Sequence, residues 1–234
     1  MHNKSVSVQE QDNLPPPLSL LAREAILFPL MRTRAAFAPA VALNVDGGGR
    51  RVMVVPGFMA SDRTTARLRK SLQKAGFDCH GWGMGRNLGI MPNIFDQMDD
   101  RISHLGGDVP LTLVGWSLGG LIAREYAKHA PHRIAKVISL GSPFSGGPRA
   151  NHAWRLYEVI ARHKVDAPPI DVTLSAKPPV PTVAIWSPRD GMVAPGAASG
   201  LPHESDVQIR ENCTHMGMIA DPRLIRRIAD IIID

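Results

Sequence analysis

A serine set between glycines is the residue of this sequence best suited to nucleophilic chemistry. Residues 115–119 read G-W-S-L-G, so Ser117 follows the apolar run "LTLVG" and precedes a helical pattern over residues 118–129. A G-x-S-x-G motif at such a strand-to-helix turn holds a serine hydroxyl at the top of a sheet, and its glycines let strand and helix pack closely. We therefore interpret Ser117 as a nucleophile. The alternative is a glycine-rich turn in which Ser117 only caps the helix.

The serine needs a general base, because its hydroxyl is a poor nucleophile near neutral pH. His215 lies in "ENCTHMGM", a loop between the last predicted strand and the final helix, and catalytic triads at such turns run in the chain order Ser, acid, His. His215 is therefore the predicted base, although a loop histidine can also be merely solvated. Histidines near helix ends or beside a surface helix have simpler explanations; these are His129, His132, His152 and His163.

An acidic residue is expected to orient the base. Asp190, in "WSPRDGMV", directly follows the predicted strand "PTVAIWS", at the carboxyl edge where α/β sheets assemble their sites. Its rivals Asp166 and Asp171 lie in an irregular segment next to prolines. The alternative for Asp190 is a turn-forming Asp-Gly pair. Because the chain order of serine, acid and base is then complete, the sequence predicts a Ser-Asp-His triad.

Acyl transfer also requires donors for the oxyanion, and two backbone N–H groups are candidates. One is the N–H of Leu118, directly after the nucleophile. The other belongs to Phe58 in "PGFMAS", the loop after the first predicted strand, where Gly57 lets the backbone turn closely. One such donor stabilises the transition state by about 3 kcal/mol.

These residues must be positioned by a sheet whose strands alternate with helices. Short apolar runs such as "RVMVV" at 51–55 are typical of parallel strands covered on both faces. The alternation predicts an α/β fold with a doubly wound, mostly parallel sheet of about six strands. The other predicted strands are "FDCHGW", "LTLVG", "IAKVISLG", "PTVAIWS" and "SDVQIR". The chain ends in a predicted helix over 221–233, with Asp221 as its cap.

The sequence divides into three parts. Residues 1–17 are polar and end in prolines, so we expect a disordered tail. Residues 18–50 hold an extra N-terminal helix, apolar around its axis and expected to bend or end near Pro29, and then a linker. Residues 51–234 form the predicted catalytic domain. The apolar helix is expected to pack on its own domain or on a second subunit of a homo-oligomer; the alternative is peripheral docking on a membrane.

An insertion over residues 147–178 contains "NHAWRLYEVIARHK". Its apolar side chains can form a small cap over Ser117, and an ordinary crossover helix between parallel strands is an equal alternative. A short cap implies an accessible site, which favours short- or medium-chain esters over emulsions. The apolar residues of the helical part are Trp154, Leu156, Tyr157 and Ile160.

Composition argues against several other classes of protein. The 27 Lys and Arg exceed the 21 Asp and Glu, but the cations are scattered without an aromatic-interleaved basic stripe, so nucleic acid is not an expected partner. Cys79 and Cys213 lie far apart and in no metal-ligand spacing, so we expect reduced thiols, no metal and a cytoplasmic location. No apolar run is long enough to span a bilayer, and the polar start lacks the features of a signal peptide.

From about Val52 to its C-terminus, the chain resembles the α/β-hydrolase superfamily, and within it the bacterial lipases and esterases. The resemblance rests on "PGF", "GWSLGG", "LGSPFSG", "SPRDGMV" and "CTHMGM". It implies Ser117 as nucleophile, Asp190 as acid and His215 as base, with Phe58 and Leu118 at the oxyanion hole and no cofactor. Two departures are visible. Pro56 replaces the usual histidine before the oxyanion loop, and Phe144 replaces the histidine of the lipase segment "GTPHxG".

The sequence thus predicts a serine carboxylic-ester hydrolase that forms an acyl-enzyme on a small-molecule or lipid ester. The chain before Val52 is too short and too helical for the first two strands of the family, so a reduced fold is expected. The same triad can serve a thioesterase or an acyltransferase. A non-catalytic hydrolase-like module that binds lipid or a protein partner is the alternative from another class.

Overall fold

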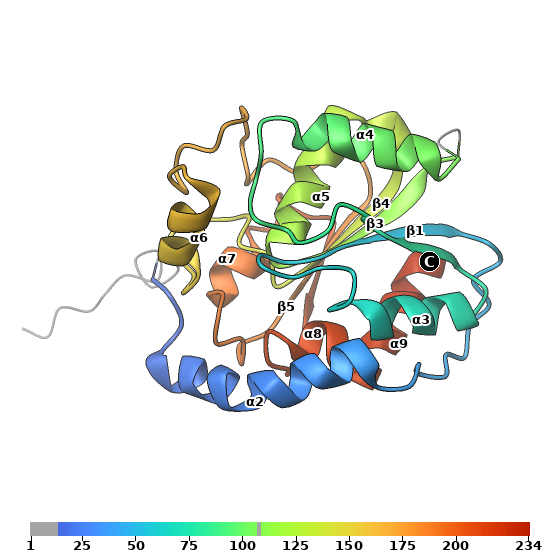
Figure 1. Cartoon of the computed structure of the whole chain (residues 1–234), viewed down its shortest axis with the longest axis horizontal. Helices are drawn as coiled ribbons and strands as arrows, with labels where there is room; N and C mark the ends of the chain where they lie inside the picture. Colours follow the sequence, from blue (N-terminus) through green and yellow to red (C-terminus); the bar gives the residue numbers. More distant parts are fainter. Residues whose placement is uncertain (1–13, 107–108) are drawn as a thin grey trace, which may run out of the picture.

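A six-stranded sheet forms the centre of the computed structural model, which describes residues 14–106 and 109–234 (Figure 1). The strands follow the order β2-β1-β3-β4-β5-β6, and each is parallel to its neighbours. The doubly wound, parallel sheet predicted from the sequence is therefore confirmed. The strands are β1 (Arg51–Val55), β2 (Asp78–Gly81), β3 (Leu111–Trp116), β4 (Ile134–Leu140), β5 (Thr182–Trp186) and β6 (Val207–Arg210).

Helices cover both faces of this sheet, as parallel crossovers require (Figure 1). The helices α4 (Ile94–His104) and α5 (Leu118–His129) lie on one face, and α3 (Ala66–Lys74) and α9 (Pro222–Ile233) lie on the other. The remaining short helices are η1 (Pro131–Arg133), α6 (Trp154–Ala161), α7 (Pro195–Ser199) and α8 (Gly217–Ala220).

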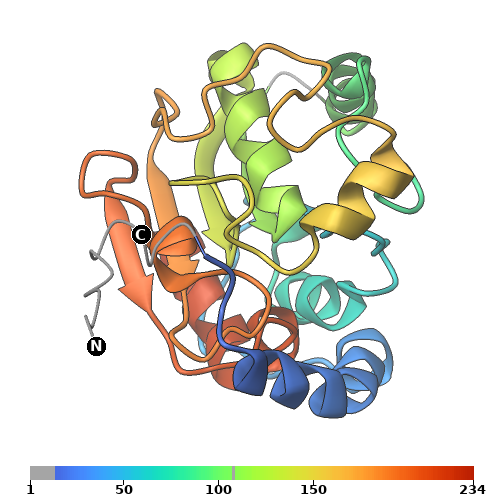
Figure 2. The same cartoon turned by 90° about the vertical axis from the view of Figure 1, so that its left-hand side faces the viewer.

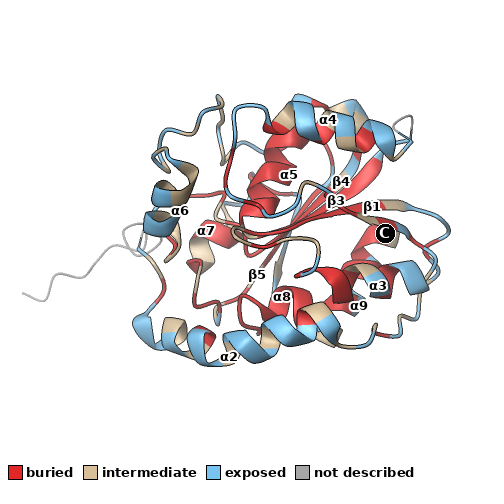
Figure 3. Ribbon diagram, viewed as in Figure 1, coloured by how far each residue is buried: buried red, intermediate tan, exposed pale blue. Residues whose placement is uncertain are grey.

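Alternation along the central strands builds an apolar core on each face. In β1, Val52 and Val54 pack into the core under α3 and α9, whereas Met53 and Val55 pack into the core under α4 and α5. Figure 3 shows the central strands and α5 as buried. Because both faces are buried, these strands read as continuous apolar runs in the sequence. The two cores hold the carboxyl ends of the strands in a rigid frame.

The N-terminal helix α2 (Leu18–Phe37) lies outside the sheet and packs against α3 and α8 (Figures 1 and 2). It does not end near Pro29. A proline removes one helical N–H, and the carbonyl that loses its donor is that of Ala25, which lies on the exposed side where water can hydrogen-bond it. The helix buries Glu24 and Ala35, whereas large side chains of its outer surface are exposed: Leu18, Ile26, Leu30 and Phe37. Figure 3 shows much of the α2 ribbon as exposed.

Three predictions concern the chain ends and a membrane span. The expected disordered tail over residues 1–17 falls mostly on residues 1–13, which lie outside the described residues. The final helix begins as predicted, because the Asp221 carboxylate accepts a hydrogen bond from the N–H of Arg223 at 2.8 Å. Within residues 14–106 and 109–234, no helix is both long and apolar enough to cross a membrane.

Candidate active site

Ser117 occupies the turn between β3 and α5 in a backbone conformation that residues other than glycine rarely adopt. Its φ and ψ are 55° and −124°, and its N–H donates to the carbonyl of Leu140 at 2.8 Å. Such a conformation costs about 1–3 kcal/mol and persists only where the surrounding structure imposes it. The turn therefore holds the serine at the carboxyl edge of the sheet.

The glycines on either side of this turn are required by close packing. A Cβ at Gly115 would lie 2.4 Å from the carbonyl oxygen of Gly119, and a Cβ at Gly119 would lie 2.2 Å from the carbonyl oxygen of Val55. Both distances are shorter than any ordinary contact, so α5 can begin directly above the ends of β1 and β3 only with glycine at these positions. The packing reason inferred from the G-x-S-x-G spacing is thus present in the fold.

His215 and Asp190 are brought together by the loops that follow β6 and β5. The distance between Nδ1 of His215 and Oδ2 of Asp190 is 2.7 Å, and both side chains are buried. The other carboxylate oxygen of Asp190 accepts hydrogen bonds from the N–H groups of Met192 and Val193 at 2.7 and 2.9 Å. The turn after Asp190 therefore fixes the carboxylate and leaves Oδ2 for the imidazole.

The surroundings of His215 favour its protonated form. Burial alone lowers the pKa of His215, but the charge of Asp190, its hydrogen bond and the charge of Glu24 outweigh burial, so the pKa lies above its usual value. The indole N–H of Trp116 donates to the carbonyl of His215 at 3.1 Å, and the two rings lie 5.2 Å apart. His215 is thus held through its ring by Asp190 and through its backbone carbonyl by Trp116.

Glu24 is a residue of this region that sequence reasoning did not select. It lies on α2, is 3% exposed, and accepts hydrogen bonds from the N–H groups of His215 and Gly191. Burial raises the pKa of Glu24, although the hydrogen bond from the His215 N–H opposes this rise. The available signal was the single carboxylate within an apolar helix, a residue type that is seldom buried without a partner.

The loop after β1 brings Phe58 beside the serine. A Cβ at Gly57 would lie 2.9 Å from the Trp116 ring, so glycine is needed for the loop to approach β3 so closely. In the described part of the chain, the backbone N–H groups of Phe58 and Leu118 donate to no protein acceptor, and both residues line the same cavity as Ser117. Free N–H groups at such a position can serve an oxyanion.

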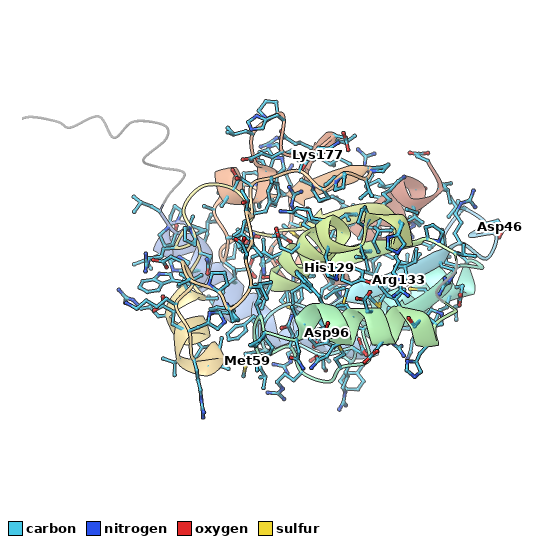
Figure 4. The ribbon with its side chains drawn as sticks, turned by 90° about the horizontal axis from the view of Figure 1, so that it is seen from above. Asp46, Met59, Asp96, His129, Arg133 and Lys177 are labelled. Carbon is cyan, nitrogen blue, oxygen red and sulfur yellow. The ribbon has the colours of Figure 1, made fainter. Side chains whose placement is uncertain are left out.

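Asn87 holds the loop after β1 in place and was also missed by the sequence analysis. Its side-chain amide donates to the carbonyl of Pro56 at 2.8 Å, and its backbone carbonyl accepts from the N–H of Met59 at 2.7 Å. Met59 has a φ of 60°, so this loop is strained as well. Figure 4 shows Met59 near α6, at the same end of the molecule. A fully buried asparagine thus supports the loop in which Pro56 stands.

An apolar cavity of about 80 Å³ lies over Ser117. It has both Ser117 and His215 in its wall, and the insertion after β4 covers it with Trp154 and Tyr157 of α6. The rings of Tyr157 and Phe58 lie 5.4 Å apart, so α6 contacts the loop after β1. Other lining side chains are mostly apolar: Ile90, Leu118, Leu121, Pro143, Val165, Leu174, Met192 and Val193.

A family model described as alpha/beta hydrolase fold matches residues 50–167 of the sequence. The chain belongs to the α/β-hydrolase family. A search among curated protein sequences found no significant match.

Solved structures similar to this α/β-hydrolase include enzymes that act on esters and thioesters. A monoacylglycerol lipase of Paleococcus ferrophilus is 14% identical at a TM-score of 0.59, with 82% of this chain and 96% of that chain covered. A metagenome-derived lipolytic enzyme is 16% identical at a TM-score of 0.58, with 82% and 98% covered. The thioesterase domain of the curacin biosynthetic pathway is 16% identical at 0.54, with 81% and 93% covered. At these identities the likeness shows the shared fold alone.

The rival acids and bases of this α/β-hydrolase lie away from Ser117. His129 stacks on Phe95 of α4, and Figure 4 shows it with Arg133 beside that helix. Asp166 forms a salt bridge with Arg149 at 2.7 Å, and Asp171 is exposed. Of the histidines in the described residues, His215 alone lines the cavity.

The cysteines and Phe144 take no part in the cavity wall. Cys79 and Cys213 are free and buried, and burial raises the pKa of each thiol to about 12. They belong to opposite edges of the sheet, because Cys79 lies on β2 and Cys213 follows β6. Phe144 is buried under the guanidinium of Arg124, 3.8 Å from the ring centre. In the described residues, no cluster of His, Cys, Asp and Glu is suited to a metal ion.

Proposed function

We propose that this α/β-hydrolase is a serine carboxylic-ester hydrolase that works through an acyl-enzyme. One observation carries the proposal. Ser117, in its strained turn, and His215, hydrogen-bonded to Asp190, form part of the wall of one apolar cavity. A nucleophile, a base and an orienting acid that converge on an apolar pocket form the minimal arrangement for acyl transfer.

In the proposed acylation, Nε2 of His215 takes the hydroxyl proton while Oγ of Ser117 attacks the ester carbonyl carbon. Asp190 holds Nδ1–H of the imidazole and stabilises the imidazolium that forms. The N–H groups of Phe58 and Leu118 donate to the carbonyl oxygen as it becomes an oxyanion. His215 then returns the proton to the leaving alcohol oxygen, the carbon–oxygen bond breaks, and the acyl group remains on Ser117.

Deacylation repeats these steps with water. His215 removes a proton from a water molecule, the water oxygen attacks the acyl carbon, and the same N–H groups stabilise the second oxyanion. The proton then passes to Oγ of Ser117, which leaves as the free hydroxyl, and the carboxylic acid departs. The same residues suffice for two related reactions. In thioester hydrolysis a thiol leaves in place of the alcohol, and in acyl transfer a second alcohol attacks in place of water.

The cavity favours short acyl chains. A volume of about 80 Å³ gives room for roughly six water-sized groups, and the walls carry few polar atoms. Burial of apolar chain against these walls contributes about 0.8 kcal/mol for each methylene until the space is filled. We therefore expect butyrate esters to be better substrates than laurate esters.

The test uses purified protein with p-nitrophenyl acetate, butyrate, octanoate and laurate, an acyl thioester of the best chain length, and a fluorophosphonate probe. The proposal expects hydrolysis, covalent labelling at Ser117, and loss of both in Ser117→Ala. Ser142→Ala, a buried serine beside the same helix, serves as the matched control and should still be labelled. If the protein turns over the thioester faster than the esters, the proposed activity becomes that of a thioesterase. Protein that neither labels nor turns over any ester would contradict it and favour a binding module.

A further inference from the structure

The N-terminal helix reaches the candidate triad through one buried carboxylate. Oε1 of Glu24 accepts hydrogen bonds from the backbone N–H of His215 and from that of Gly191, the latter at 3.3 Å. Gly191 directly follows Asp190. One carboxylate oxygen on α2 therefore accepts hydrogen bonds from both loops, the one that carries Asp190 and the one that carries His215.

The approach of α2 to these loops depends on the absence of a side chain at Gly191. A Cβ at this position would lie 2.3 Å from the carbonyl oxygen of Leu20 and 2.6 Å from Cγ of Glu24. The backbone of α2 is thus in contact with the residue after Asp190.

The charge of Glu24 is not neutralised by a basic side chain. Among the residues that the structure describes, no lysine or arginine forms a salt bridge with Glu24. A buried carboxylate that keeps only hydrogen bonds from backbone N–H groups is costly. The charged groups that face His215 are Asp190, from the loop after β5, and Glu24, from α2. When His215 is protonated, its imidazolium therefore faces both carboxylates.

We infer that Glu24 is a positioning residue of the active site. Its carboxylate joins the loops that carry Asp190 and His215, and its negative charge assists Asp190 in stabilising the imidazolium. This inference rests on the proposed function, in which His215 is the base. It assigns α2, which precedes the matched hydrolase region, a direct role in the site.

The first variant is Glu24→Gln, which keeps an oxygen acceptor and removes the charge. Loss of a nearby negative charge lowers the pKa of His215, so the acid limb of the kcat/KM profile should move to lower pH by about one unit. The plateau value of kcat should fall by less than about tenfold, because the base becomes weaker but keeps its position. A purely structural role for Glu24 would change stability and would leave the position of this limb unmoved.

The second variant is Glu24→Ala, which leaves both N–H groups without an acceptor. We expect kcat to fall by at least about tenfold with KM little changed, because the base is displaced while the cavity is intact. Glu24→Asp keeps the charge but moves the carboxylate oxygens away from the two N–H groups. Its kcat/KM profile should therefore keep the acid limb of the wild type, whereas its kcat should be reduced. Glu24→Asp decides the question if Glu24→Gln does not fold; wild-type kcat in Glu24→Asp would then overturn the inference.

Glu125→Gln is the matched control. Glu125 is also a buried carboxylate, but it lies on α5 beside Lys128, and its substitution should leave the limb unchanged. The imidazole titration of His215 is also measured by NMR in Ser117→Ala, with and without Glu24→Gln. This measurement needs no turnover, so it separates failure of this inference from failure of the proposed function. Identical titrations and identical pH profiles with and without the Glu24 charge would overturn the inference.

Discussion

Nδ1 of His215 lies 2.7 Å from Oδ2 of Asp190, although 25 positions separate the two residues in the chain. We expect Asp190→Asn to lower kcat by about 10⁴-fold, because an amide does not hold the imidazole in the tautomer that accepts the serine proton. The measurement is kcat with p-nitrophenyl butyrate. Asp166→Asn, at the rival acid, should leave kcat unchanged. A loss smaller than about tenfold in Asp190→Asn would show that another group orients the base.

Activity should rise with pH as His215 loses its proton. The two carboxylates and the hydrogen bond to Asp190 outweigh burial and raise the pKa of His215, so the half-maximal value of kcat/KM should lie above about pH 6.5, the usual histidine value. The sign follows because only the neutral imidazole accepts the hydroxyl proton. A profile that is flat from acid to mildly alkaline pH would count against a histidine base.

Asn87→Ala should weaken catalysis without touching the triad. The substitution removes the hydrogen bond to the carbonyl of Pro56, so the loop that carries the Phe58 N–H loses its support. We expect kcat to fall by up to about 10²-fold, the effect of losing one oxyanion donor. Asn93→Ala, at the exposed start of α4, is the control and should keep wild-type kcat. Equal kcat values for Asn87→Ala and Asn93→Ala would contradict the proposed role of the Phe58 N–H as an oxyanion donor supported by Asn87.

Cys213→Ser should keep most of the activity. The thiol is buried two residues before His215, and its pKa of about 12 leaves it protonated and unreactive at the pH of the assay. Native protein should also resist iodoacetamide at both cysteines. The expectation fails if Cys213→Ser is as inactive as Ser117→Ala.

Deletion of residues 1–37 should give insoluble or strongly destabilised protein. Helix α2 packs against α3 and α8, and its loss also removes the acceptor for the N–H of His215. Melting temperature, soluble yield and binding to anionic vesicles are the measurements. Soluble and fully active protein that has lost vesicle binding would instead identify α2 as a membrane anchor, the alternative that its apolar sequence left open.

The strands and the serine turn were predictable because local sequence determines them. β1 and α5 have the bounds that the apolar runs and the G-x-S-x-G spacing indicate, since a strand buried on both faces is apolar along most of its length. Ser117, Asp190 and His215 were selected by type and chain order, and the fold places them at one end of the sheet. Whether these residues act on an ester stays a proposal.

Glu24 and Asn87 were missed because their partners are distant in the sequence. Glu24 contacts a residue 191 positions further along, and Asn87 contacts one that lies 31 positions earlier. Neither residue belongs to a motif, and each gains its role only through burial beside a loop that the fold brings near. Helix α2 continues past Pro29 to Phe37 for a related reason, because the effect of a proline depends on which side of the helix faces water. A bend at Pro29, the other half of that expectation, stays a prediction.

The backbone conformation with positive φ at Ser117 means that thermal stability and the proposed catalytic activity favour different residues at this position. Glycine takes a φ of 55° without strain, so the chain with glycine at this position loses the proposed nucleophile and gains a relaxed turn. Random mutagenesis followed by selection for thermal stability alone would therefore enrich variants that are stable but inactive. Under the proposed function, directed evolution of this chain must score hydrolysis in every round, because the least strained variant and the most active one differ at this residue.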